Sequence, residues 1–202
     1  MNQSQFLKRS IFQLIGVRDV IAQHSSRESE LLKKYACGKK NVVEIGVAEG
    51  ASAAEILDVM NAEGTLYLID PYPPGRFFGI NFQEIIANRH ISKKKSEGVV
   101  WLKGYSYDIS RKWNKQIDFL FIDGDHSYEI CRRDWDEWSQ FVADDGIVVF
   151  HDARLFDKGW TTPETGPVKL VNKLFRSKVN IDWEIIDEID SMVVVRKREN
   201  VR

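Results

Sequence analysis

The amino-acid sequence predicts an α/β fold: a doubly wound, seven-stranded, mostly parallel sheet with an antiparallel last strand and added N-terminal helices. The main observation is that five short apolar segments alternate with helical segments between residues 41 and 175, as in repeated βαβ units. In addition, the strand-like segments WEIIDEI and SMVVVRK close the chain with only a short turn between them, which predicts an antiparallel hairpin.

The length of 202 residues suits a single domain, with an N-terminal helical cap over residues 1–38 and the α/β core over residues 40–198. In the cap, QFLKRSIFQLIGV has apolar residues at helical spacing. The segment SSRESELLKKYA begins with Ser25 and Glu28 at the spacing of a capping box, so we expect a second helix there.

Within the core, the continuous apolar run of IDFLFIDGD is typical of a strand in the middle of a parallel sheet. Trp135 and Trp138 lie at helical spacing and are expected on the inner face of the helix that follows this strand. The parallel strands are expected over residues 41–47, 65–72, 99–106, 117–125 and 146–152. The helices are expected over residues 51–64, 81–95, 127–142 and 167–175, with a short helical turn over 110–114.

Composition limits the classes of partner and compartment. A formal net charge of −1 argues against general attraction to nucleic acid or anionic lipid. Cys37 and Cys131 are far apart and predict two free thiols rather than a disulfide or zinc site. We find neither a signal peptide nor a membrane-spanning apolar run, so we expect a cytoplasmic protein that does not enter a membrane.

Polar residues or glycines follow nearly every predicted parallel strand, at the sheet edge where open α/β folds bind their ligands. This distribution is harder to explain by core packing than any one residue would be. The positions are Glu44, Gly46 and Gly50; Asp70; Gly104 and Ser106; Asp123, Asp125 and His126; and His151 and Asp152.

The turn after the first strand reads E-x-G-x-x-x-G-x-S and differs from the G-x-G-x-x-G of dinucleotide enzymes. Its glycines allow a ligand to approach the backbone, but Glu44 and Glu49 would repel a pyrophosphate. Asp70 stands where a carboxylate accepts hydrogen bonds from ribose hydroxyls. A cationic nucleoside, S-adenosyl-L-methionine, satisfies both conditions. Alternatively, Asp70 only initiates a turn with Pro71, and Glu49 faces solvent at a helix N-terminus.

The segments VVEIGVAEGASA, LYLIDPY, WLKGYS, IDFLFIDGDHSYE and GIVVFHD resemble, in order and spacing, class I S-adenosylmethionine-dependent methyltransferases. The likeness covers about residues 40–152. It is greatest to the metal-dependent small-molecule O-methyltransferases of the catechol type and of the macrocin and natural-product sugar type. The resemblance implies a Rossmann-like methyltransferase fold.

The same resemblance implies cofactor contacts at the first three strand ends and at Asp123. The implied positions are Glu44 and Gly46 beside the methionine part, with Gly50 in the same turn, Ser52 near the methionine carboxylate, Asp70 at the ribose, and Ser106, after Gly104, beside the adenine.

Asp123, His151 and Asp152 match the positions that hold a magnesium ion in the metal-dependent relatives, and His126 matches the lysine base of the catechol type. This chain departs from that pattern twice. It has His151 where Asp or Glu is usual, and His126 where the catechol type has Lys.

Methyl transfer to oxygen requires an in-line acceptor and a way to remove its proton. Mg²⁺ or Mn²⁺ on Asp123, His151 and Asp152 would lower the pKa of the acceptor, and His126 would take the proton. Residues 151 and 152 can both ligate only if the strand turns there. Three alternatives stay open: Asp123 or Asp125 caps the next helix, His151 is a hydrogen-bonded lining residue, or a metal-free enzyme uses one histidine as base.

The expected acceptor is a small molecule, and the aromatic loops over residues 71–82 and 153–167 are candidates for its pocket through Phe77, Phe78 and Trp160. The N-terminal helices offer a surface for a homodimer. The rival interpretations are a noncatalytic nucleoside-binding or interaction module on the same fold and, disfavoured by the acidic turn, a nicotinamide oxidoreductase.

Overall fold

The computed structural model describes residues 20, 22–75, 79–94, 97–157, 159–177 and 179–198. The helix predicted within residues 5–17 and the pocket candidates Phe77 and Phe78 lie outside these described residues.

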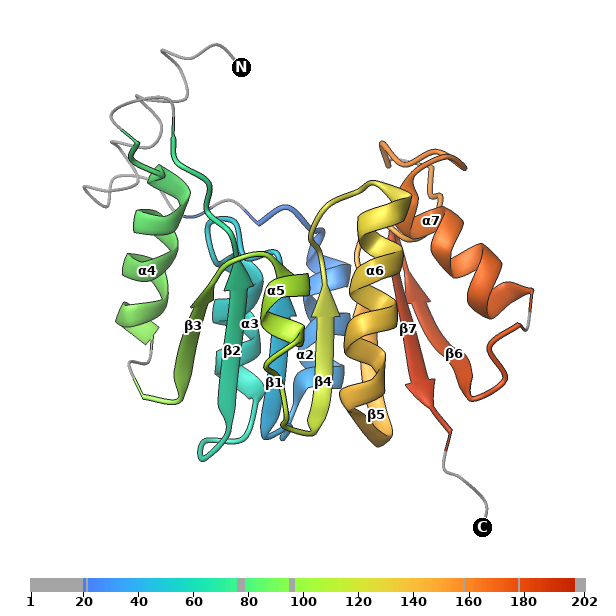
Figure 1. Ribbon diagram of the computed structural model, residues 1–202, viewed down its shortest axis with the longest axis horizontal. Coiled ribbons are helices and arrows are strands. Elements are labelled where there is room, and N and C mark those ends of the chain that lie inside the picture. Colours follow the sequence, from blue (N-terminus) through green and yellow to red (C-terminus); the bar gives the residue numbers. More distant parts are fainter. Residues whose placement is uncertain are drawn as a thin grey trace.

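The described chain forms a seven-stranded sheet in the order β3-β2-β1-β4-β5-β7-β6 (Figure 1). Strands β1 to β5 are parallel to one another, whereas β7 is antiparallel to both β5 and β6. The predicted fold class, including the closing hairpin, is confirmed. The strands are β1 (Asn41–Ile45), β2 (Thr65–Asp70), β3 (Val99–Lys103), β4 (Ile117–Ile122), β5 (Val142–Phe150), β6 (Trp183–Ile189) and β7 (Met192–Lys197).

Helices cover both faces of the sheet. The contacts of α2 with α3 and of α3 with α4 place these three on one face, and α5, α6 and α7 share the other (Figure 1). The helices are α2 (Ser26–Ala36), α3 (Ala51–Val59), α4 (Phe82–Lys94), α5 (Ser106–Ser110), α6 (Tyr128–Trp138), the 3₁₀ turn η1 (Ser139–Phe141), α7 (Gly166–Val171) and the π-helical turn η2 (Asn172–Arg176).

Each face of the sheet has its own apolar core. Leu32 of α2, Ile56 of α3 and Ile91 of α4 pack on one face. On the other, Trp135 and Trp138 of α6 are buried, as the sequence predicted. The sheet is therefore rigidly supported on both sides, so its strand ends can hold side chains in fixed positions.

One predicted element is misplaced. The short helical turn expected over residues 110–114 is instead the helix α5, which ends at Ser110. Trp113 leaves the helix and packs edge-on against Tyr67, with ring centroids 4.7 Å apart, and it also contacts Trp138. Burial of this aromatic side chain outweighs the local preference for helix.

The cysteines and the length of the helices bear on two further predictions. Cys37 and Cys131 are both free thiols, as predicted. Within the described part of the chain, every helix is too short or too polar to cross a bilayer.

Candidate active site

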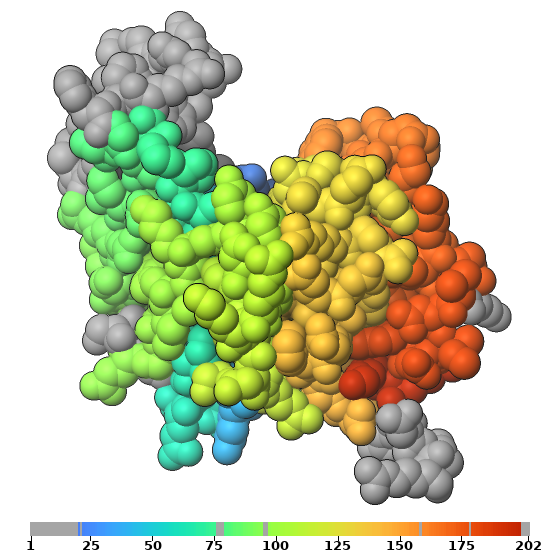
Figure 2. Space-filling model, in the orientation of Figure 1, coloured from blue at the N-terminus to red at the C-terminus, as the bar shows by residue number. Residues whose placement is uncertain are grey.

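A cavity of about 440 Å³ lies at the carboxyl ends of β1, β2 and β4. This volume is within the range of small-molecule sites. Its walls come from the turn after β1, from Asp70 and Pro71, from residues 105–107, and from residues 123–126. In Figure 2 the surface is hollowed at this upper edge, between the green segment after β3 and the yellow segment after β4.

The turn after β1 brings the chain very close to β4, and glycine makes this possible. Gly46 has a φ of +87°, and a Cβ atom there would lie 2.0 Å from the carbonyl oxygen of Asp123. Gly50, with a φ of +81°, is the residue before α3. Because L-residues with a side chain rarely adopt such angles, both predicted glycines are needed for the shape of this cavity wall.

Asp70 supports the same turn. Its Oδ2 accepts hydrogen bonds from the backbone N–H of Val47 at 3.0 Å and of Ala48 at 3.2 Å, and its Oδ1 accepts one from Tyr72 at 2.8 Å. Asp70 also lines the cavity, where the sequence predicted a ribose contact. The carboxylate therefore fixes the turn whether or not a ligand is bound.

Glu44 is fully buried behind Ser52, which lines the cavity and donates a hydrogen bond to Glu44 Oε1 at 2.5 Å. Among the described residues, its other oxygen, Oε2, has no hydrogen-bond partner. Burial, reinforced by the nearby carboxylates Asp123 and Asp70, raises the pKa of Glu44 to about 8. Glu44 is thus a neutral acid at pH 7 in the absence of a nearby cation.

The end of β3 supplies Ser106, which begins α5 and lines the cavity. Its hydroxyl donates a short hydrogen bond to Asp134 of α6, and burial raises the pKa of Asp134 to about 6. Gly104 is not among the residues that line the cavity. A Cβ atom at this position would meet only Ile109, at ordinary contact distance. Of the two residues predicted near the adenine, Ser106 is therefore the one at the cavity wall.

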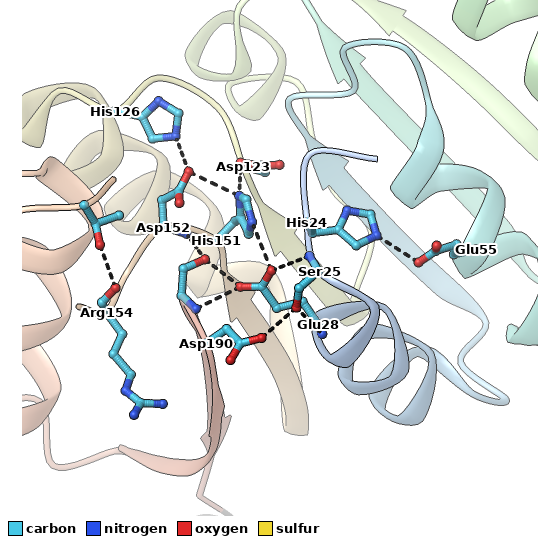
Figure 3. A network of polar contacts seen from close by, with 12 residues as sticks. His24, Ser25, Glu28, Glu55, Asp123, His126, His151, Asp152, Arg154 and Asp190 are labelled. Atoms are coloured by element: carbon cyan, nitrogen blue, oxygen red, sulfur yellow. Dashed lines mark hydrogen bonds and ion pairs between the residues drawn. The ribbon is translucent and has the colours of Figure 1, made fainter. Parts of the chain in front are cut away.

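The ends of β4 and β5 bring two aspartates and two histidines together (Figure 3). Nδ1 of His151 lies 3.0 Å from Asp123 Oδ1 and 3.3 Å from Asp152 Oδ2. Asp152 Oδ2 also lies 3.1 Å from Nε2 of His126. The chain does turn after His151, because Asp152 has a φ of +49°, and this turn brings both side chains to the same cluster.

The two histidines have different environments. His151 is buried; burial alone would lower its pKa, but hydrogen bonds to Asp123, Asp152 and Glu28 outweigh it and raise the pKa to about 12. His126 has 42% of its side chain exposed at the cavity wall, and its hydrogen bond to Asp152 raises its pKa. His151 is therefore a buried cation among carboxylates, and His126 is the histidine that a ligand can reach.

Asp125 has a local role. Its Oδ1 accepts a hydrogen bond from the backbone N–H of Ser127 at 2.7 Å, immediately before α6. Hydrogen bonding to the side chain and then to the backbone of Ser127 lowers the pKa of Asp125. Asp125 therefore holds the turn before α6, whereas the N-cap of α6 is Ser127, and among the described residues no side chain makes a cap hydrogen bond to this helix. The alternative in which Asp125 caps α6 is wrong.

One group of donor atoms that could hold a metal ion includes His126. Atoms of Asp123, His126 and Asp152 lie within 4.8 Å of one another, whereas the prediction had His151 in place of His126. The predicted set stays a prediction, and its His151 Nδ1 lies 3.0 Å from Asp123 Oδ1 and 3.3 Å from Asp152 Oδ2. Two carboxylates with one imidazole are a chemically suitable donor set for Mg²⁺ or Mn²⁺.

Several site residues were missed by the sequence interpretation. Gln23 and His24, which precede α2, line the cavity, and His24 Nε2 lies 3.0 Å from Oε2 of Glu55. Glu28 was expected only to cap α2, yet it contacts His151 (Figure 3). Local sequence patterns carry no signal for these contacts, because they depend on how α2 docks against the sheet.

A family model described as a methyltransferase domain matches residues 43–153, from β1 to the turn after β5. The chain belongs to this methyltransferase family. This match confirms the resemblance found in the sequence.

Individual relatives of this methyltransferase are distant. The uncharacterized protein R132 of Acanthamoeba polyphaga mimivirus is 33% identical over an alignment of 138 positions that covers 65% of this chain and 58% of that protein. The chain thus spans less than two thirds of that relative's length.

Solved structures share the fold. An O-methyltransferase from Bacillus cereus in complex with SAH has a TM-score of 0.68 at 14% identity, covering 98% of this chain and 93% of that one. The O-methyltransferase NovP has a TM-score of 0.69 at 17% identity, covering 98% of this chain and 100% of that one.

Proposed function

We propose that this methyltransferase transfers the methyl group of S-adenosylmethionine to a hydroxyl oxygen of a small molecule, with His126 as the proton acceptor. The observation that carries the proposal is the pairing of the half-exposed His126 with the buried Asp152 at the wall of the cavity. A carboxylate that holds one ring nitrogen of a histidine orients the ring and stabilises its protonated form.

The cofactor is proposed to occupy the cavity formed by the turn after β1, Asp70 and Ser106. Glu44 lies behind Ser52 on the side proposed for the methionine part. The ammonium and sulfonium charges of S-adenosylmethionine would favour ionised carboxylates there, whereas a pyrophosphate would be repelled. This choice of ligand matches the chemistry of the family.

In the proposed step, the acceptor oxygen attacks the methyl carbon in line with the departing sulfur, giving the methyl ether and S-adenosylhomocysteine. If Nε2–H of His126 donates to Asp152 Oδ2, Nδ1 carries the lone pair that takes the hydroxyl proton. His126 returns that proton to water after product leaves, so no net charge accumulates on the protein.

The acceptor is proposed to bind beside Trp160. This side chain is 60% exposed and meets the ring of His126 edge-on, with centroids 5.0 Å apart. A small molecule held against Trp160 would place a hydroxyl close to His126. The net charge of −1 supports a small-molecule acceptor over nucleic acid.

A metal-assisted version of the same function is favoured by the clustering of Asp123, His126 and Asp152. These residues would hold Mg²⁺ or Mn²⁺, which supplies Lewis-acid activation of the acceptor oxygen when bound. In that version a ring nitrogen of His126 would bind the metal, so His126 would not be the base. The two versions therefore differ in the role of His126.

The proposal is tested by incubating the protein with methyl-labelled S-adenosylmethionine and a panel of phenols and sugars, with EDTA or with Mg²⁺. We expect label in an O-methyl product. Activity in EDTA supports His126 as base, and strict dependence on Mg²⁺ supports the metal version. Transfer only to nitrogen, protein or RNA would contradict the proposed acceptor class.

A further inference from the structure

Glu28 makes more contacts than a helix cap requires. It lies in the first turn of α2 and is only 2% exposed. Its Oε2 accepts the capping-box hydrogen bond from the N–H of Ser25 at 2.7 Å. Its Oε1 accepts hydrogen bonds from both the N–H and the hydroxyl of Ser191, at 2.8 and 2.7 Å, in the turn between β6 and β7.

Glu28 also contacts the buried histidine of the site from behind (Figure 3). Its Oε2 lies 3.9 Å from Nε2 of His151, while Nδ1 on the other side of that ring lies 3.0 Å from Asp123. The polar chain then continues through Asp152 to His126. It runs from the N-terminal end of α2 to the cavity wall.

We propose that Glu28 is a positioning residue of the active site, which orients the His151 ring so that Nδ1 faces Asp123 and Asp152 and thereby holds Asp152 against His126. This inference rests on the proposed function of His126. Glu28 does not line the cavity, so it acts through His151 rather than on the cofactor or acceptor.

The choice of glutamate supports a role beyond capping. Glutamine at the third helical position completes a capping box as well as glutamate does, so the cap alone requires no negative charge. At Glu28 a negative charge faces the imidazole of His151, and both side chains are buried. In a buried site such a pairing fixes geometry, because a charge left without its partner is costly.

Two further contacts hold the N-terminal end of α2 in place. The Ser25 hydroxyl donates to Asp190 Oδ2 at 2.7 Å, and Arg27 lies 2.9 Å from Asp190 Oδ1. Together with the two hydrogen bonds that Glu28 accepts from Ser191, these contacts attach α2 to the turn before β7. The position of Glu28 relative to His151 is therefore set by two elements rather than by one flexible side chain.

The test is NMR of the histidine rings, since the chain has 4 histidines and each ring can be assigned by substitution. Glu28→Gln keeps the capping geometry but removes the charge behind His151. We expect the ring signals of both His151 and His126 to move and the His24 signal to stay. Glu55→Gln is the matched control, because Glu55 pairs with His24, and it should move the His24 signal only.

Calorimetric titration of the same variants with S-adenosylhomocysteine provides a second readout. We expect Glu28→Gln to bind within about twofold of the wild type, because Glu28 is away from the cavity wall. If Glu28→Gln does not fold, Glu28→Asp decides instead. It draws the carboxylate away from His151 by one methylene and should move the His126 signal in a folded protein.

A His126 signal that stays in place in Glu28→Gln, or in Glu28→Asp where that variant decides, overturns the proposal. Neither readout needs the methyl acceptor. If no O-methyl product is found but His126 responds to Glu28→Gln, the proposed function fails while the positioning role stands.

Discussion

The carboxylate of Asp70 fixes the backbone at the cavity wall in the ligand-free protein. Its two oxygens accept three backbone hydrogen bonds, two of them from the glycine-rich turn after β1. The sequence predicts that Asp70 contacts the ribose. In the structure Asp70 also holds the turn after β1 in place. Both roles concern the same cavity wall.

Asp70→Ala should weaken S-adenosylhomocysteine binding by about 10-fold to 150-fold, the equivalent of about 1.5–3 kcal/mol for a lost charged acceptor. Calorimetric titration measures this. The matched control is Asp118→Ala, because Asp118 accepts two backbone N–H bonds at the opposite end of the sheet. Equal affinity in Asp70→Ala and wild type would remove Asp70 from the cofactor site.

The raised pKa of the buried Glu44 should make the stability of the cofactor-free protein depend on pH in an unusual way. Its pKa is raised from 4.5 to about 8 by burial, so above pH 4.5 the unfolded chain loses a proton that the folded chain keeps. Stability should therefore fall as pH rises from 4.5 to 8.

Glu44→Gln should remove this loss and be more stable than wild type at pH 8 by about 3–5 kcal/mol, with little difference at pH 4.5. Urea unfolding at both pH values measures the difference. Glu63→Gln, at an exposed glutamate, should leave the pH dependence unchanged. The same slope in wild type and Glu44→Gln would mean that Glu44 is ionised in the folded state.

His126 is the residue on which the chemistry depends most. His126→Gln should reduce turnover by about 10²–10⁴-fold, the usual contribution of a general base, with S-adenosylhomocysteine affinity nearly unchanged. His90→Gln on α4 is the control and should retain wild-type turnover. A His126→Gln enzyme with wild-type turnover would refute the assignment of the base.

At the scale of elements, α2 connects the sequence pattern to the site. Its capping box was readable from Ser25 and Glu28, and both reciprocal hydrogen bonds are present. The place where α2 docks could not be predicted from the sequence. Ser25 donates a hydrogen bond to Asp190, and Glu28 accepts one from Ser191, and both partners are more than 160 positions away in the chain. Periodicity reports the apolar face of a helix but not which distant turn its polar end meets.

Ser25→Ala should cost about 1–2 kcal/mol of folding free energy, because it removes the cap of α2 and the hydrogen bond to Asp190 together. Denaturant unfolding measures the cost. Ser26→Ala, at the exposed neighbouring position, should change stability by less than about 0.5 kcal/mol. Equal stability of the two variants would show that the cap of α2 is unimportant.

At the scale of the whole molecule, the order of the strands brings the ends of β1, β2 and β4 around one cavity. The sequence predicted this edge, because period-two and continuous apolar segments define strands and the residues after them. It did not predict that His151 lies behind Asp123 and Asp152 while His126 faces the cavity. That division depends on the left-handed turn at Asp152 and on the charge of Glu28, which no local pattern specifies.

The most direct test of the account is calorimetric titration of the whole chain with S-adenosylhomocysteine, once with Mg²⁺ and once with EDTA. We expect micromolar binding at one site per chain in both conditions, because Ser52, Asp70 and Ser106, which are proposed to contact the cofactor, lie outside the Asp123, His126 and Asp152 cluster. No binding in either condition would contradict the central claim that this cavity holds the cofactor.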